Sequence, residues 1–399
     1  MVAVSAREWR GEQGRPHHFM RRCALAGWHV LYVEPPATLL APLKRWSRAA
    51  RWRIWRAGVR PASADVSLLA PPPIVPFGNC YRWINRLNQR LIARSIRSAL
   101  TRIGSPGADL YTFLPGCVDL IPHLRCDRVV YDCVDDHAAF AGWIRPRVVR
   151  RMERELVERA DVCFASARAL HDRLCAWTDR AHLIANGCDA DHFAAPGPGN
   201  GPPVPPELAR LAAANAPAGR RRPIAGFVGA IGEWFDLELI AAVARRLPGV
   251  DVVLIGPATV DLSLFDGVAN VHALGSREYS DLPAYLQCMT VALIPFRLTP
   301  LTTSVSPIKL FEYLAAGKPV VSTPLPEVVP YRGPVAIAGD TDAFVAAVGE
   351  AVSRPADPGA ERTRRAIASR CSWDARWAQA VQAMRAPAAA SRADARRHA

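Results

Sequence analysis

Short apolar segments with the composition of β-strands alternate with helical segments along almost the whole chain. Most of the apolar segments lack polar alternation, which is typical of strands covered on both faces. We expect strands at Trp28–Pro35, Asp65–Pro71, Ala108–Pro115, Asp127–Asp135, Ala160–Ser166, Ala181–Gly187, Ile224–Gly232, Val250–Pro257, Asn270–Gly275, Val291–Phe296 and Lys318–Pro324. We expect helices at Arg15–Gly27, Tyr81–Thr101, Pro146–Arg159, Ala167–Ala176, Leu237–Arg246, Asp281–Cys288, Ile308–Ala316, Asp342–Ser353, Glu361–Ala368 and Trp373–Met384. This order predicts an α/β protein with doubly wound parallel sheets.

The 399 residues exceed the usual size of one domain, which is about 100–200 residues. A segment rich in proline and glycine interrupts the alternation, which then restarts. We therefore expect an N-terminal Rossmann-like domain over 1–195, a linker over 196–222 and a C-terminal Rossmann-like domain over 223–371. A last helix over 372–385 precedes a tail, 386–399, whose composition predicts disorder.

The net charge of +14 indicates an anionic partner without identifying it. No stretch approaches the roughly 18 uninterrupted apolar residues of a spanning helix, and the first residues lack the hydrophobic centre of a cleavable signal. We therefore expect a cytoplasmic protein. The ten cysteines form no Cys-x-x-Cys pair, which favours free thiols over disulfides or a zinc site.

Two segments of the second half predict an anion-binding site at the ends of strands. One carries glycines, and the other carries charged residues at the start of a helix. Gly229 and Gly232 follow an apolar strand, although a tight turn explains them equally well. In "SPIKLFEY", we expect Ser306 to cap a helix, Pro307 to suit its first turn, and Lys309 to add a positive charge. One turn on, the carboxylate of Glu312 suits hydrogen bonds from two hydroxyls, as of a ribose. The alternative is a surface salt bridge between Lys309 and Glu312.

The ordered set of segments resembles GT-B glycosyltransferases, specifically the retaining family 4 enzymes. "SPIKLFEYLAAGKPVVST" is similar to the donor-binding segment of that group, and "FVGAIGEWFDLELI" to the start of its donor domain. "NVHALGSREYSDLPAYL" corresponds to the wall of the nucleobase pocket, and "SWDARW" to a terminal helix that crosses back to the N-terminal domain. The resemblance implies two Rossmann-like domains facing a central cleft, and a transfer that needs neither a metal nor a cofactor.

The resemblance assigns Glu312 to the nucleotide ribose, and places Gly275, Ser276 and Arg277 along the nucleobase. The family has a second glutamate, separated by seven residues from the one at Glu312, and Ser304 replaces it here. The family's basic pair near the first loop is also missing. By this resemblance, Lys309 and the backbone amides between Val305 and Ile308 must then carry more of the contact with the diphosphate. Pro307 and Ile308 are therefore among the expected donor-binding residues. The donor sugar is left open.

Two clusters in the first half are candidates for acceptor binding and proton transfer. Gly14 and His17 precede or begin a helix near expected strand ends, followed by His18. Asp135, Asp136 and His137 leave a strand together, and with His18 they are the candidate catalytic residues. The alternatives are a metal site and histidines that only pack or cap.

The segment Leu43–Arg60 is basic, rich in tryptophan and free of acidic residues. Such a helix suits an anionic membrane, with contacts from Arg45, Trp46, Arg48, Trp52, Arg53 and Trp55. The helix Tyr81–Thr101 would extend this surface through its arginines. A nucleic-acid site and a solvated domain helix are the alternatives.

We therefore expect a glycosyltransferase that moves a sugar from a nucleoside-diphosphate sugar to a hydroxyl acceptor, with retention. The expected acceptor is a lipid-linked or cell-envelope polysaccharide precursor at the inner face of the membrane, and no nucleic acid is expected to bind. Two rivals stay open. One is a catalytically impaired GT-B binding or regulatory protein, and the other is a nucleotide-sugar epimerase.

Overall fold

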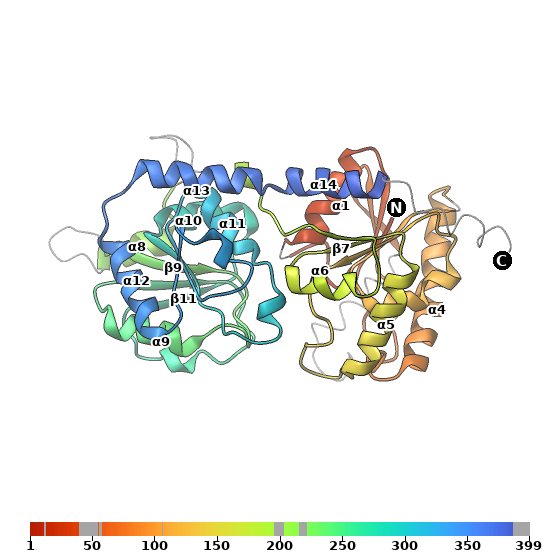
Figure 1. Ribbon diagram of the computed structural model, residues 1–399, viewed down its shortest axis with the longest axis horizontal. Helices are drawn as coiled ribbons and strands as arrows, with labels where there is room; N and C mark the ends of the chain where they lie inside the picture. The colour runs from red at the N-terminus through yellow and green to blue at the C-terminus, as the bar shows by residue number, and fades with distance from the viewer. Residues whose placement is uncertain are drawn as a thin grey trace. The chain divides into compact units, whose positions relative to one another are not determined.

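The computed structural model describes residues 1–11, 13–39, 55, 58–105, 107–194, 203–214 and 222–385. It divides into two compact units. Unit 1 contains Met1–Ala185 and the residues from Arg376 onward, and unit 2 is Asn186–Ala375. Each unit is a parallel sheet between layers of helices, so the fold is two Rossmann-like doubly wound α/β domains (Figure 1).

The sheet of unit 1 has the strand order β3-β4-β2-β1-β5-β6-β7-β8. Its neighbouring strands run parallel, apart from the antiparallel pair β3 and β4. The strands are β1 (Val2–Val4), β2 (Val30–Val33), β3 (Val59–Ser63), β4 (Val66–Leu69), β5 (Leu110–Thr112), β6 (Val129–Cys133), β7 (Val162–Ala165) and β8 (Ala181–Leu183). The central strands are buried on both faces, which explains their unbroken apolar sequences.

Helices cover both faces of this sheet. The helices of unit 1 are α1 (Arg15–Leu25), α4 (Arg82–Arg102), α5 (Pro146–Arg159), α6 (Arg168–Cys175) and, from Arg376 onward, α14 (Trp373–Arg385), with short 3₁₀ turns η1 (Pro115–Asp119) and η2 (Ile121–His123). Ile96 of α4 and Met152 of α5 share one core with alternate strand residues such as Tyr131. Phe19 of α1 packs edge-on against Trp377 of α14, with ring centroids 5.5 Å apart.

The sheet of unit 2 has the order β11-β10-β9-β12-β13-β14, and its paired strands are parallel. The strands are β9 (Ile224–Val228), β10 (Asp251–Ile255), β11 (Val271–Gly275), β12 (Val291–Ile294), β13 (Val320–Ser322) and β14 (Val335–Ile337). Its helices are α7 (Ala190–Phe193), α8 (Pro206–Ala214), α9 (Leu237–Arg246), α10 (Leu282–Cys288), α11 (Ile308–Ala315), α12 (Thr341–Ser353) and α13 (Pro358–Arg370), with 3₁₀ turns η4 (Ser263–Phe265), η5 (Tyr279–Asp281), η6 (Thr302–Ser304) and η7 (Val329–Tyr331). Helices α9 and α12 pack together, as do α11 and α13 (Figure 1).

Several elements differ from the sequence-based expectations. Strands β1, β3 and β14 were not expected, because runs of three to five residues carry little periodic signal. The division between the units lies at 185 rather than 195. The described part of the expected linker contains α8, which packs on unit 2 through the buried Leu208. The end of the expected basic helix, from Val59, is strand β3.

Within the described part of the chain, no helix is both long enough and apolar enough to cross a membrane. The tail 386–399, for which the sequence predicts disorder, lies outside the described residues.

Candidate functional site

Three neighbouring strands of unit 2 end in glycines at the carboxyl edge of the sheet. Gly229 follows β9, Gly256 follows β10, and Gly275 ends β11. The Gly229 N–H donates to Ile255 O at 2.8 Å, and the Gly256 N–H donates to Gly275 O at 2.9 Å. A Cβ on Gly256 would lie 1.9 Å from Gly229 O, so only glycine fits there. The sequence analysis missed Gly256, because it fell inside the expected strand Val250–Pro257, whereas β10 ends at Ile255.

Helix α11 is fixed against the end of β9 by Tyr313. Its hydroxyl accepts a hydrogen bond from the Val228 N–H at 2.8 Å and donates one to Val228 O at 3.3 Å. Complete burial raises the pKa of Tyr313, so the hydroxyl stays protonated. One turn earlier, the side chain of Lys309 crosses the Gly229 turn, since its Cε lies 3.1 Å from the position of a Gly229 Cβ.

Lys309 and Glu312 form an ion pair on the first turns of α11, with Nζ and Oε2 2.9 Å apart. The Glu312 side chain is only 5% exposed and that of Lys309 is 24% exposed. A surface salt bridge would leave both groups solvated, whereas this carboxylate is held inside the protein. The pair expected as the alternative to a ligand site therefore exists, but at a buried position beside the glycine turn.

The start of α11 is organised differently from the expected serine cap. The N-cap residue is Pro307, and no side chain caps the helix. Ser306 is engaged by Asn186 instead, whose backbone N–H donates to Ser306 Oγ at 3.3 Å and whose Nδ2 donates to Ser306 O at 2.7 Å. The N–H groups of Ile308 and Lys309 are thus left without a side-chain cap, at the positive end of the helix dipole. Asn186 carries no motif that sequence reasoning would have detected.

Arg277 is held within the protein by groups that the sequence analysis did not connect to it. Its Nε donates to Glu207 of α8 at 3.0 Å and to the Tyr285 hydroxyl at 2.7 Å, and one terminal nitrogen donates to Leu274 O at 2.6 Å. Hydrogen bonds from Tyr285 and Arg277 lower the pKa of Glu207 to about 2. The guanidinium therefore fixes the backbone at the end of β11. This includes the neighbouring Ser276, whose carbonyl accepts a further hydrogen bond from Arg277 at 2.9 Å.

Two further positions complete the surroundings of the glycine turns. Gly232 lies under the indole of Trp234, because a Cβ there would be 2.6 Å from the ring. Ser304, which stands where the resembled family has a glutamate, is 7% exposed, and its hydroxyl donates to Pro300 O at 3.4 Å. No acidic group is supplied by position 304, so the site has only Glu312 from that pair of positions.

In unit 1, Asp135 and His137 follow β6 together, and the structure leaves the Asp135 carboxyl without a hydrogen bond from any described residue. Burial raises the pKa of Asp135, an effect that His137 and Arg7 partly oppose. The His137 Nε2 donates to Phe113 O at 2.9 Å, which leaves Nδ1 on the other side of the ring. A carboxyl with a raised pKa beside an oriented imidazole is suited to accept a proton.

Asp136 lies in a different environment from its neighbours. Its carboxylate pairs with Arg150 and with Arg173, which is 3.4 Å away, and it accepts a bond from the Ala138 N–H at 3.1 Å. Both arginines also pair with the buried Glu153, at 3.2 and 3.1 Å. Asp136, expected among the catalytic residues, is therefore bound into an ion cluster that joins β6 to α5 and α6.

The expected acceptor residues near α1 are mostly internal. His17 is fully buried; its Nδ1 accepts a bond from the Gly14 N–H at 3.1 Å, and its Nε2 donates to Glu8 O at 2.7 Å. Burial, with Arg7 nearby, lowers the pKa of His17 to about 4, so the ring is neutral. Both ring nitrogens serve to fold the loop onto α1, which leaves His17 no atom for an acceptor. His18 is 3% exposed on the same helix.

The expected membrane contacts fall mainly on residues outside the described part of the chain. These are Arg45, Trp46, Arg48, Trp52 and Arg53. Trp55 is described and is partly buried. Among the described residues, no three His, Cys, Asp or Glu side chains are grouped so that they could hold a metal ion.

Comparison with known proteins agrees with this geometry. Residues 222–354, which include the glycine turns and α11, match the family described as glycosyl transferases group 1. Over 291 residues the chain is 28% identical to a putative teichuronic acid biosynthesis glycosyltransferase, TuaH of Bacillus subtilis, covering 68% of this chain and 70% of the relative. The chain therefore has the GT-B fold, and it resembles glycosyltransferases in sequence.

Solved structures of low sequence identity share the fold of this chain over nearly its whole length. Sucrose-phosphate synthase from Thermosynechococcus elongatus superposes with a TM-score of 0.70 at 16% identity, covering 96% of this chain and 98% of that one. Anabaena HepE, solved in complex with UDP and glucose, gives a TM-score of 0.64 at 13% identity, covering 97% and 99%. These likenesses show that the chain has the GT-B fold.

Proposed function

We propose that the protein transfers a glycosyl group from a nucleoside-diphosphate sugar to a hydroxyl acceptor, with retention at the anomeric carbon. The observation that carries this proposal is the position of Lys309, whose side chain lies against the Gly229 turn at the uncapped start of α11. Backbone amides, a helix N-terminus and an ammonium group together favour a diphosphate. The UDP and glucose in the HepE structure support a donor of this class.

In this proposal, Lys309 leaves Glu312 when the donor binds. Its ammonium moves to the diphosphate, and the freed Glu312 carboxylate accepts hydrogen bonds from the two ribose hydroxyls. Stabilisation of the departing diphosphate then lowers the barrier to transfer. Asp135 and His137 are proposed to orient the acceptor hydroxyl and take up its proton.

The test is the variant Glu312→Ala, studied by thermal shift with UDP, GDP, dTDP and their sugars. Loss of the ribose contact is expected to weaken binding of the preferred nucleotide by about 10- to 100-fold, with turnover reduced in parallel. Glu350→Ala removes a partner of an exposed ion pair in the same unit and serves as the control, with no expected effect. Unchanged nucleotide affinity in Glu312→Ala would contradict the assignment.

The same assays separate the rival functions. A non-catalytic binding protein would bind a nucleotide sugar without releasing the nucleoside diphosphate. An epimerase would convert the donor sugar in the absence of an acceptor. Comparison of the anomeric configuration of donor and product by NMR tests retention.

We propose further that transfer requires no divalent ion, because Lys309 and the amides at the start of α11 provide the neutralising charge. Turnover is therefore expected to persist in EDTA after removal of bound ions. Loss of activity in EDTA that Mg²⁺ or Mn²⁺ restores would contradict a metal-independent reaction.

We propose that the acceptor is a lipid-linked or cell-envelope polysaccharide precursor, and the likeness to TuaH supports an envelope polysaccharide. Unit 1 exposes Trp83 (66%), Trp143 (53%) and Leu87 (42%), beside Arg86, whose side chain is 63% exposed. Aromatic rings next to arginines suit the headgroup region of an anionic membrane at the inner face of the cell membrane. Co-sedimentation with phosphatidylglycerol vesicles, but not with phosphatidylcholine vesicles, is the expected result, and Trp83→Ala should reduce it.

A further inference from the structure

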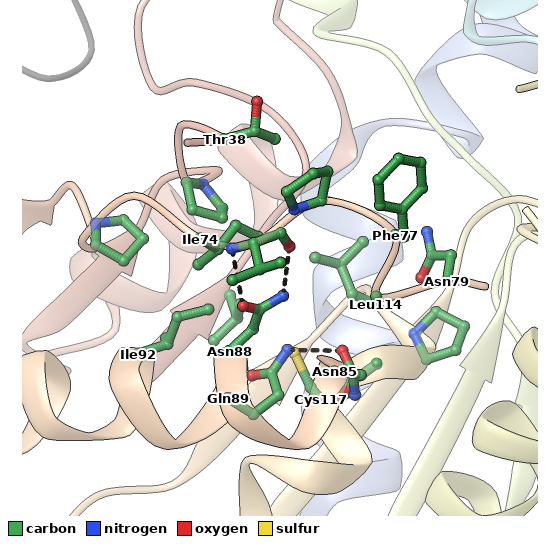
Figure 2. Close-up of a pocket in the computed structure, with 18 of the residues that line it drawn as sticks. Thr38, Ile74, Phe77, Asn79, Asn85, Asn88, Gln89, Ile92, Leu114 and Cys117 are labelled. Atoms are coloured by element: carbon green, nitrogen blue, oxygen red, sulfur yellow. Dashed lines mark hydrogen bonds between the residues drawn. The ribbon is translucent and has the colours of Figure 1, made fainter. Parts of the chain in front are cut away.

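A cavity of about 460 Å³ lies wholly within unit 1 (Figure 2). Helix α4 forms one side of it, and residues 71–79 and 114–117 form others. Its volume falls in the range of about 300–1,000 Å³ that is usual for small-molecule sites. His137, which the proposed mechanism places beside the acceptor hydroxyl, is one of its lining residues.

The α4 side of the cavity carries three side-chain amides, of which two are occupied. Asn88 brackets Val75, accepting a bond from its N–H at 3.0 Å and donating to its carbonyl at 2.8 Å. Asn85 donates to Gly116 O at 2.9 Å and to Asp119 at 2.7 Å. Figure 2 shows Gln89 beside Asn85 at the lower edge of the cavity.

Gln89 is the amide with unused capacity. The residue is 8% exposed, and its Oε1 has no hydrogen-bond partner among the described residues. Its Nε2 donates only a long bond, 3.5 Å, to Asn85 Oδ1. A buried carbonyl without a partner is costly, so a ligand hydroxyl that donates to Gln89 Oε1 would be stabilised there.

The remaining walls are largely apolar, with Ser5, Glu34, Thr38, Asn79 and His137 as their polar or ionisable residues. The rings of Phe77 and Trp143 lie 4.5 Å apart between centroids, and Trp143 remains 53% exposed. Neither lysine nor arginine is among the described lining residues, whereas the carboxylate of Glu34 is. A phosphate group would meet no lysine or arginine among these lining residues, and the one carboxylate there, Glu34, is already paired with Arg60.

We propose that this cavity binds a neutral, hydroxyl-bearing ring, namely the glycosyl unit of the acceptor. The proposal rests on the proposed transferase function and adds the chemical class of the acceptor end that enters unit 1. The apolar face of such a ring packs on Phe77 and Trp143, while an equatorial hydroxyl donates to Gln89. An alkyl or isoprenoid chain would instead leave the Gln89 carbonyl buried without a partner.

The experiment uses the full chain and a set of defined probes. These are the methyl glycosides of glucose, galactose and N-acetylglucosamine, with glucose 6-phosphate as the charged comparison and farnesol as the lipid comparison. Binding is measured by saturation-transfer difference NMR and by tryptophan fluorescence, at up to about 10 mM, where a site of millimolar affinity is filled.

At least one neutral glycoside is expected to bind, more tightly than glucose 6-phosphate and farnesol. Gln89→Leu should weaken that binding by about tenfold. Gln287→Leu is the matched control, because Gln287 of unit 2 also has a buried amide atom without a partner, and it should change nothing. Trp143→Ala removes an exposed ring that folding does not require, and it should weaken glycoside binding as well.

Absence of a signal from all three glycosides, tighter binding of the phosphate or of farnesol, or unchanged binding in both Gln89→Leu and Trp143→Ala would overturn the proposal. Nucleotide binding in unit 2 is measured on the same samples. If its sensitivity to Glu312→Ala persists while glycoside binding fails the test, only the assignment of this cavity is lost, and the proposed function stands.

Discussion

At the scale of single residues, the proposed function gives the ion pair of Lys309 and Glu312 a role both with and without a bound donor. In the described structure, each neutralises the other at 2.9 Å, so that neither charge is left unpaired beside the sheet edge. A diphosphate offers Lys309 a stronger partner, and a ribose offers Glu312 two donors. In the proposed function, the pair keeps the site neutral without a ligand, and its exchange would couple recognition of the phosphate to recognition of the ribose.

His17 gives a prediction about stability at mildly acidic pH. Its pKa is about 4 in the folded chain and about 6.5 when exposed, so the unfolded chain binds one more proton between these values. Stability is therefore complete above pH 6.5 and falls as the pH drops towards 4, by up to about 3 kcal/mol. Denaturant titrations of the wild type and of His17→Gln, followed by circular dichroism, measure this difference.

Glutamine can still donate to Glu8 O, but it does not titrate. The variant is therefore expected to lose less stability than the wild type between pH 6.5 and 4, whatever its stability at neutral pH. Equal losses in both proteins would mean that His17 does not remain neutral in the fold.

Residue roles could be predicted from the sequence only where a local pattern carried them. Lys309 and Glu312 were found because they lie three positions apart at the start of a helix. The ion pairs of Asp136 and Arg277 were not foreseeable, because their partners lie further away along the chain, as Glu207 lies 70 residues before Arg277. The partners of His17 are close in sequence, but its bonds depend on how the preceding loop folds onto α1. Whether the predicted site residues contact substrates stays a prediction.

At the scale of elements, the site depends on how closely three strand ends approach. Gly256 has φ +141° and lies against Gly229 O, which brings the β9 and β10 loops into backbone contact. Tyr313 then holds α11 against the same edge. The amides and the ammonium group are thus positioned by rigid elements rather than by a loop alone.

Gly256→Ala tests this arrangement. The added Cβ would meet Gly229 O, so the two loops must separate. We expect the free energy of unfolding to fall by more than the roughly 1–3 kcal/mol of backbone strain alone, together with weaker nucleotide binding. Gly267→Ala is the matched control, since Gly267 also has a positive φ of +77° but nothing lies within 4 Å of its Cβ position. It should show the backbone cost alone and bind nucleotide normally, as measured by thermal shift with and without UDP.

Most long elements could be predicted, because their periodicity and ends are local properties. Helices α5 and α9 have the bounds that the sequence indicated, and Asp236 caps α9 through the Leu239 N–H. Strand β1 was missed although it is central in its sheet, since three apolar residues give no period. Helix α8 was missed because the proline- and glycine-rich sequence around it predicts a linker.

At the scale of the whole molecule, the order of motifs predicts only partly which chain segments build each unit. Unit 1 uses both ends of the chain, and α14 contributes to it from Arg376 onward. Trp377 is 8% exposed and packs against Phe19 and Trp28, at 5.5 and 6.0 Å between centroids. The crossing helix was expected, but its aromatic contacts were not.

Trp377→Ala is expected to destabilise unit 1 by about 3–5 kcal/mol, the usual cost of removing a buried aromatic side chain. Trp83→Ala, which removes a tryptophan that is 66% exposed, should cost less than about 0.5 kcal/mol. Differential scanning calorimetry with and without UDP distinguishes the units, because the nucleotide should raise only the transition of unit 2. A Trp377→Ala protein with both transitions unchanged would show that α14 contributes little to unit 1.

Unit 1 is built from two separate segments of the chain, and this affects the order in which the two units can fold during synthesis. Phe19 emerges from the ribosome long before Trp377, and all of Asn186–Ala375 is made in between, which takes roughly 10–40 s at about 5–20 residues per second. During that interval the nascent N-terminal half has an uncovered aromatic surface, whereas unit 2 is continuous and can fold as soon as it is released. Unit 2 can therefore complete its fold first, whereas unit 1 is completed only when α14 has been synthesised.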